Sequence, residues 1–290
     1  MSSVESLAGP ADLSDREREA VELLLRRLAD DEFVLADRYT EWQVRAPTIE
    51  SDIAIANIAQ DELGHARLWY DLLEDFGYTE PDLLWERDPA TFRHSTLVEL
   101  PFSEGDWADC VVRSYLYDEA ESLRLNALAD SSYPRIRDRV EKVLGEEDYH
   151  REHATNWLRR LVASEEGRRR VQEATDRLFP YALTLFEPAA DAAEAEAAID
   201  ELGVRTRTLA DLRAEWIERV TETMTDVGVD LRAPELDADG RLDADVLPDH
   251  VGRDGDHTDH WRVLYDDFTE AYREMGLHEA TRFMKDPDDV

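Results

Sequence analysis

Two Glu-x-x-His steps are the residues in this chain whose types and spacing could do chemistry. They run from Glu62 to His65 and from Glu147 to His150, and both lie inside long stretches with helical periodicity. A Glu and a His three residues apart share one face of a helix. Two such pairs form half of a carboxylate-bridged two-metal site in a helical bundle. The number of steps alone is weak, because an acidic chain with eight histidines gives roughly one by chance.

The position of each step on its helix is more informative than the count. Glu62 and His65 continue an apolar stripe, and Glu147 and His150 continue another, so all four side chains are expected to face the core. The first stripe consists of Ile55, Ile58 and Trp69, and the second of Val140, Val143, Ala154 and Trp157.

Two further helices place an acid on an apolar face in the same way. Glu32 interrupts the stripe of Leu25, Leu28, Leu35 and Tyr39, and Asp118 falls on the face of Val111, Tyr115 and Ser122. Periodicity leaves Glu119 and Glu121 open as alternatives on the third helix, although Asp118 fits the apolar face best. On the fourth helix, Glu146 also lies one turn from His150, at a spacing of four.

Charge favours a metal centre at these positions. Four uncompensated buried carboxylates would cost more free energy than the whole stability margin of a domain. Two divalent ions carry a charge of +4, which balances four carboxylates and two neutral imidazoles, and these ligands suit iron or manganese. The alternative is that the acids line a wet groove or pair with Arg38, Arg67 or Arg124.

Four long helices are needed to bring these residues together. Capping signals, apolar periodicity and prolines predict helices over about 14–46, 48–77, 106–129 and 134–163. Residues 78–102 contain three prolines without a sustained period and read as a long crossover. This order is typical of an all-α, ferritin-like four-helix bundle, which we expect to occupy residues 1–164.

The remaining chain, 165–290, reads as additional C-terminal helices packed on the bundle, within one continuous domain. We expect helices over 165–228 interrupted at Pro180 and Pro188, a loop over 229–257 and a last helix from Thr258 to Met275.

The composition limits the classes of partner. Asp and Glu total 69 against 33 Lys and Arg, and the formal net charge of -36 repels nucleic acid and anionic membranes. This surplus of acidic over basic residues predicts adaptation to high salt rather than an ordinary solvated acidic face. Cys110 is the only cysteine, and the sequence has neither a signal-like N-terminus nor a long apolar run, so we expect a cytoplasmic protein without disulfides.

Other histidines and the tryptophans have less specific interpretations. We expect His153 to be a supporting or packing residue, and Trp42, Trp69 and Trp157 to be core residues. His257 and His260 lie where a helix begins, and we expect capping or interface roles because no neighbouring acids complete a ligand set.

Several segments resemble the PaaC family, the C subunits of bacterial phenylacetyl-CoA epoxidase, within the ferritin-like di-iron superfamily. They are Leu28-Ala-Asp-Asp-Glu-Phe-Val-Leu35, Glu41-Trp42, Ala46-Pro47, residues 52–58, residues 209–216 and His257-Thr258-Asp259-His260. The resemblance implies one component of a multicomponent di-iron monooxygenase that epoxidises the ring of phenylacetyl-CoA in aerobic phenylacetate breakdown. In that family the A-type chain holds the metal and the C-type chain is usually regarded as structural.

This chain departs from the C-type pattern at its candidate ligands, whose surrounding segments look like the A-type motif. The resemblance therefore implies two iron ions, with manganese possible, held by Glu32, Glu62, His65, Asp118, Glu147 and His150. It also implies an oligomer with a homologous A-type chain, an acyl-CoA substrate and electrons from a partner reductase, since the chain has no flavin or nicotinamide motif. Alternatives are a non-catalytic structural partner and a standalone metal-binding bundle.

Overall fold

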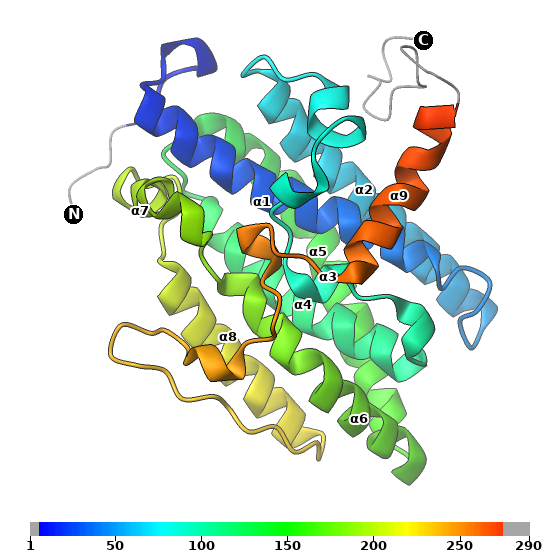
Figure 1. The fold of residues 1–290 in the computed structure, drawn as a ribbon. Coiled ribbons are helices and arrows are strands. Elements are labelled where there is room, and N and C mark those ends of the chain that lie inside the picture. The colour runs from blue at the N-terminus through cyan, green and yellow to red at the C-terminus, as the bar shows by residue number, and fades with distance from the viewer. Residues whose placement is uncertain (1–5, 275–290) are drawn as a thin grey trace.

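Four long helices position the candidate ligands. They are α1 (Asp15–Thr40), α2 (Ile49–Glu74), α4 (Trp107–Leu128) and α5 (Pro134–Val162) (Figure 1). The structure is a computed structural model that describes residues 6–274. Helix α1 packs along α2, α4 packs along α5, and α2 contacts α5. The fold is all-α and ferritin-like, as the sequence predicts; residues 6–274 contain no strand, only an isolated bridge between Leu236 and Leu242.

Side-chain caps explain where these helices begin. Ser14 and Glu17 form a capping box at α1, and the hydroxyl of Thr48 accepts from the backbone of Ser51 at α2. Asp106 and Asp109 form a second capping box at α4. The stripes expected on the four helices are buried, apart from a partly buried Trp157. The starts predicted for the four helices agree with the structure to within one residue.

The end of α1 was predicted wrongly. The helix stops at Thr40 rather than near Ala46, and turns follow it. Val44 has a φ of 62°, in the left-handed region, which is incompatible with a continuing helix and is rare for a β-branched residue. The periodicity of residues 41–46 is therefore overridden by the turn into α2.

The crossover between α2 and α4 has no long helix, as expected, but it contains several short turns. They are a π turn (Pro81–Trp85), 3₁₀ turns (Pro89–Thr91 and Phe102–Glu104) and the single-turn α3 (Thr96–Glu99). The carboxylate of Asp30 accepts hydrogen bonds from the backbone of Arg93 and the side chain of Arg87, and Asp31 accepts one from Ser95. Buried acids of α1 therefore hold the crossover in place.

The C-terminal part adds α6 (Glu165–Ala182), α7 (Ala193–Glu201), α8 (Leu209–Asp226) and α9 (Asp259–Glu274). Helix α6 packs on α4 and α5, α8 on α4, α7 on α1, and α9 contacts α3. Pro180 does not interrupt α6 as predicted; it lies in the last turn, and a 3₁₀ turn (Leu183–Phe186) follows directly. The expected end of the last helix at Met275 lies outside the described residues. Within residues 6–274, no helix is long and apolar enough to cross a membrane.

Candidate metal centre

Three of the four bundle helices bring their acids and histidine to one point. Glu32 of α1, Glu62 and His65 of α2, and Glu147 of α5 each offer one ligand atom, and these atoms all lie within 4.8 Å of one another. The Nδ1 atom of His65 is 3.3 Å from Oε1 of Glu147 and 3.7 Å from Oε2 of Glu32. All four side chains are buried.

His150 of α5 completes the other half of this cluster. Its Nδ1 atom lies 3.3 Å from Oε1 of Glu147 and 3.5 Å from Oε1 of Glu62. The rings of His65 and His150 are 6.1 Å apart between centroids. The two Glu-x-x-His steps therefore face each other across the bundle, as their shared phase predicts.

The outer nitrogen of each histidine meets an acid from the opposite helix. Nε2 of His65 lies 2.7 Å from Oε2 of Glu146 on α5, and Nε2 of His150 lies 3.3 Å from Oδ2 of Asp61 on α2. A carboxylate on the outer nitrogen fixes the ring and leaves the inner nitrogen free for a metal. Sequence reasoning missed Asp61 and paired Glu146 only with His150; the signal was an acid directly before each motif Glu.

Many buried polar atoms in this cluster have no hydrogen-bond partner. They are both carboxylate oxygens of Glu32, Glu62 and Glu147, Oδ1 of Asp118, and Nδ1 of His65 and His150. Leaving one such atom unsatisfied costs about 1–3 kcal/mol. Carboxylate oxygens and imidazole nitrogens that converge without partners fit the ligand set of two divalent transition-metal ions.

In the absence of a metal, the pKa values of three of the four acids and of both histidines of this cluster are raised. Burial raises the pKa of Glu32, Glu62 and Asp118, and the charge of a neighbouring acid raises each further, although a hydrogen bond with Glu32 lowers that of Glu62. Burial opposes protonation of the histidines, but adjacent carboxylates raise the pKa of His65 to about 12 and raise that of His150 as well. In the metal-free state, protons on the imidazoles therefore supply the positive charge that the acids require.

The third bundle helix, α4, contributes three acids with different surroundings. Glu119 pairs with Arg151 at 3.0 Å. Glu121 pairs with Arg124. Asp118 has no ion pair among the described residues, and its pKa is raised by burial and by the charge of Glu147. Of the three, Asp118 is the acid without an ion pair, and the charges of His150 and Arg151 only partly offset the rise in its pKa.

The remaining sequence expectations have mixed outcomes. Trp69 is fully buried in the core, whereas Trp42 and Trp157 are partly buried and pack on either side of Trp107, at 5.5 and 5.2 Å between centroids. His153 is half-buried beside Tyr149.

The expectation for His257 is wrong on one point, because an acid does approach it. Oε2 of Glu99 lies 3.1 Å from its Nδ1 atom and 3.0 Å from Nε2 of His94. These partners come from the crossover, 158 residues away for Glu99, so no local spacing indicates them. His260 is more exposed and has Glu104 at 3.8 Å.

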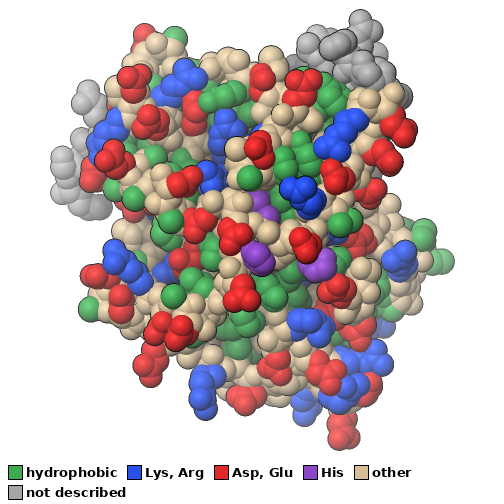
Figure 2. All heavy atoms as spheres, in the orientation of Figure 1, with side chains coloured by type: hydrophobic (Ala, Val, Ile, Leu, Met, Phe, Trp, Pro, Cys, Tyr) green, Lys and Arg blue, Asp and Glu red, His purple; other side chains and the backbone are tan. Residues whose placement is uncertain are grey.

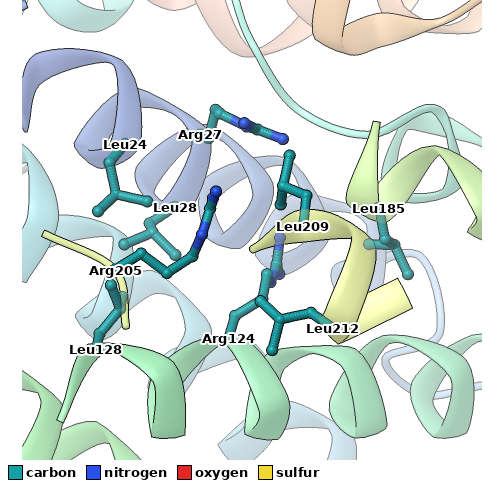
Figure 3. A pocket seen from close by; sticks show the side chains of 9 residues that line it. All are labelled: Leu24, Arg27, Leu28, Arg124, Leu128, Leu185, Arg205, Leu209 and Leu212. Carbon is teal, nitrogen blue, oxygen red and sulfur yellow. The ribbon is translucent and has the colours of Figure 1, made fainter. Parts of the chain in front are cut away.

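A small cavity lies apart from the candidate ligands, between α1, α4 and α8 (Figure 3). Its volume of about 20 Å³ is enough for one water molecule and excludes an organic substrate. Arg27 and Arg205 on its wall both pair with Glu196, so their charges are compensated. The lining consists of Leu24, Arg27, Leu28, Arg124, Leu128, Leu185, Arg205, Leu209 and Leu212.

Comparison with known proteins identifies the family of this chain. Residues 4–276 match the family described as "Phenylacetic acid catabolic protein" (PaaA_PaaC). The chain belongs to this family. It is 33% identical over 195 residues to the C subunit of 1,2-phenylacetyl-CoA epoxidase from Escherichia coli, covering 66% of this chain and 75% of that relative. It is also 25% identical over 199 residues to the A subunit of the epoxidase from the same organism, covering 68% of this chain and 64% of that relative.

Membership of the PaaA_PaaC family confirms the resemblance found in the sequence. The greater identity is to the C-type relative, as the quoted segments indicate, while both relatives match about two thirds of the chain. The chain is thus similar to both kinds of epoxidase subunit, and the identities alone do not decide which role it has.

Proposed function

We propose that this PaaA_PaaC protein is one component of a phenylacetyl-CoA epoxidase, or of a close relative, and that it holds a di-iron centre of its own. The proposed ligands are Glu32, Glu62, His65, Asp118, Glu147 and His150. The substrate assignment rests on the relatives, which are named as components of 1,2-phenylacetyl-CoA epoxidase.

The observation that carries the metal assignment is the convergence of unpaired ligand atoms. Five of the six side chains lie within 3.7 Å of another member through ligand atoms, and Asp118 borders them with an unpaired Oδ1. Among the described residues, none of the four acids pairs with an arginine. Here Arg38 and Arg124 instead pair with Glu41 and Glu121.

The roles of the chain's own residues follow from the geometry. Two iron ions, when bound, would supply the reductive activation of dioxygen. Glu146 and Asp61 would orient the ligand rings of His65 and His150 through their outer nitrogens. The buried stripes of the bundle would keep water from the centre, so that reactive oxygen is used on substrate. Manganese suits the same ligands.

The proposed partners are a homologous A-type chain and a reductase component. Electrons must reach the centre from outside this chain, which has one cysteine and hence no cysteine-ligated iron–sulfur cluster of its own.

A second candidate function is a non-catalytic component that stabilises an A-type partner. The greater identity to the C-type relative favours it. In that case the buried acids would hold a structural metal or protons, and the partner would carry the turnover.

The experiment that separates these functions is turnover of phenylacetyl-CoA by the reconstituted complex with the chain altered at Glu62→Ala. The proposed function predicts a loss of at least 100-fold in rate, because a metal ligand is removed. Glu152→Ala, an exposed position on α5, is the matched control and should leave the rate unchanged. Equal rates for Glu62→Ala and wild type would assign the turnover to the A-type partner.

A further inference from the structure

A second group of potential ligands lies outside the four-helix bundle. His94 and Glu99 belong to the crossover, and His257 belongs to the segment just before α9. One nitrogen of each histidine and one oxygen of Glu99 lie within 4.8 Å of one another. His94 and Glu99 are fully buried, and the side chain of His257 is 5% exposed. Two chain segments far apart in sequence therefore meet at a cluster of metal-binding side chains.

The hydrogen bonds of His257 fix which of its nitrogens carries a proton. Its Nε2 atom lies 3.2 Å from the carbonyl oxygen of Phe92, which can only accept, so Nε2 carries hydrogen. In the neutral ring Nδ1 is then a bare lone pair, 3.1 Å from a carboxylate oxygen of Glu99. Two acceptors at this distance repel unless a second proton or a metal ion lies between them.

A metal ion satisfies this arrangement in the way that known metal sites do. Ligating histidines donate their other N–H to a carbonyl or carboxylate, as His257 does to Phe92. Ligating carboxylates are hydrogen-bonded in turn, and Oε1 of Glu99 accepts from the backbone N–H of Thr258 at 3.0 Å. Both of these orienting contacts are already present.

His94 is the third potential ligand, and its ring must change orientation to complete the site. Its Nδ1 atom is buried without a hydrogen-bond partner, while its Nε2 atom lies 3.0 Å from the same oxygen of Glu99. The rings of His94 and His257 lie 4.3 Å apart at 25°, so a shared ion requires one ring to rotate. Rotation of His94 breaks no hydrogen bond at Nδ1. Tetrahedral ligands at about 2.0–2.2 Å from an ion are about 3.3–3.6 Å apart, so the distances of 3.0 and 3.1 Å here would have to lengthen by a few tenths of an ångström.

We propose that His94, Glu99 and His257 form a mononuclear site for a divalent transition-metal ion of the zinc class, separate from the centre of the bundle. Two imidazoles and one carboxylate are a zinc ligand set that leaves a fourth position for water. The ion would fasten the segment before α9 to the crossover. This inference does not depend on the proposed function, because it uses none of the bundle ligands.

The surrounding chain is built for close approach at this point. A side chain at Gly252 would overlap the carbonyl of His94, and one at Gly255, with a φ of +77°, would overlap the carbonyl of Ala90. Trp261 packs edge-on against His94 at 4.5 Å and donates to the carbonyl of Pro89 at 3.0 Å. The segment before α9 is thus held against the crossover by contacts that do not use the metal, and these contacts bring the three side chains together before an ion binds.

Zinc binding by the full chain tests the site directly. After chelation and dialysis against zinc, wild type should retain one equivalent more than His257→Gln, measured by elemental analysis. His260→Gln, three residues away and outside the cluster, is the matched control and should bind as much zinc as wild type. His65→Ala alters a ligand in the bundle and not in this cluster, so this variant should keep the one equivalent of zinc that His257→Gln loses. Equal zinc in His257→Gln and His260→Gln would overturn the proposal.

A second measurement on wild type covers the case in which His257→Gln does not fold. Nitrogen chemical shifts of the histidine rings, recorded with saturating zinc, should show His257 with hydrogen on Nε2 alone. Hydrogen on both ring nitrogens of His257 would instead establish an ion pair with Glu99 and contradict the metal site.

Discussion

Oε1 of Glu147 lies 3.3 Å from Nδ1 of both His65 and His150, so a single oxygen faces both halves of the candidate centre. The sequence predicts that these three side chains face the core, because their positions on the apolar stripe of an amphipathic helix determine which side chains point inward. It could not separate Asp118 from Glu121, since both are buried on α4 and only the position of Arg124 distinguishes them. It also could not place Asp61 beside His150, because that contact depends on how α2 and α5 pack.

The free energy of unfolding of the metal-free protein should fall as pH rises from 5 to 9. Glu32, Glu62 and Asp118 have raised pKa values, so between about pH 4.3 and those values the folded state binds more protons than the unfolded state. The raised pKa of His65, about 12, acts with the same sign, since its contribution is complete below about pH 6.5 and is lost toward pH 12. Each extra proton gives a slope of about 1.4 kcal/mol per pH unit.

Urea unfolding of chelated protein in molar salt, which screens the surface charge, checks this slope. Glu147, whose pKa is lowered to about 2 by His150 and His65 against the effect of burial, acts below about pH 4.3 and does not disturb the window. Glu62→Gln should flatten the slope and Glu152→Gln should not. With metal bound, the free energy of unfolding should instead rise with pH, because the ligands must be deprotonated to bind the metal. A flat profile for metal-free wild type would contradict the account.

At the scale of elements, buried ion pairs join helices α1 and α4 to the loop before α9. Oδ2 of Asp31 on α1 accepts from Arg124 on α4 at 2.5 Å and from Arg253 of the loop before α9 at 2.6 Å. Arg253 is fully buried and also donates to the backbone carbonyl of Arg93 in the crossover. Helix starts were predictable because caps are local. The end of α1 and these long-range pairs were not, because they depend on tertiary contacts.

Arg253→Leu should lower the free energy of unfolding by about 3 kcal/mol, the lower end of the range for breaking a buried pair, since Asp31 keeps Arg124. Arg262→Leu, at an exposed position on α9, is the control and should change stability by less than about 0.5 kcal/mol. Denaturant unfolding at fixed pH and salt measures both. A cost for Arg253→Leu no larger than that of the control would show that the loop is held by its other contacts.

At the scale of the whole molecule, the acidic surface dominates. Figure 2 shows acidic side chains spread over one face between fewer basic ones. Composition predicts this surface directly. It does not predict that His94, Glu99 and His257 meet, because that depends on where the crossover and the C-terminal segment cross.

The thermal midpoint should rise by at least 10 °C between dilute buffer and molar salt, because screening weakens the repulsion among charges that sum to -36. Scanning calorimetry at constant pH with potassium chloride, on chelated protein, measures this. An unchanged midpoint would show that the acids are an ordinary solvated surface.

The most direct test of the central claim is the iron content of this chain purified from its native host. We expect close to two iron or manganese ions per chain in wild type. We expect the same content in Glu152→Ala, and a loss of at least half in Glu147→Ala, which removes the oxygen facing both histidines. Wild-type protein with no more than a trace of either metal would contradict this claim, and the buried acids would then be charges held by protons alone.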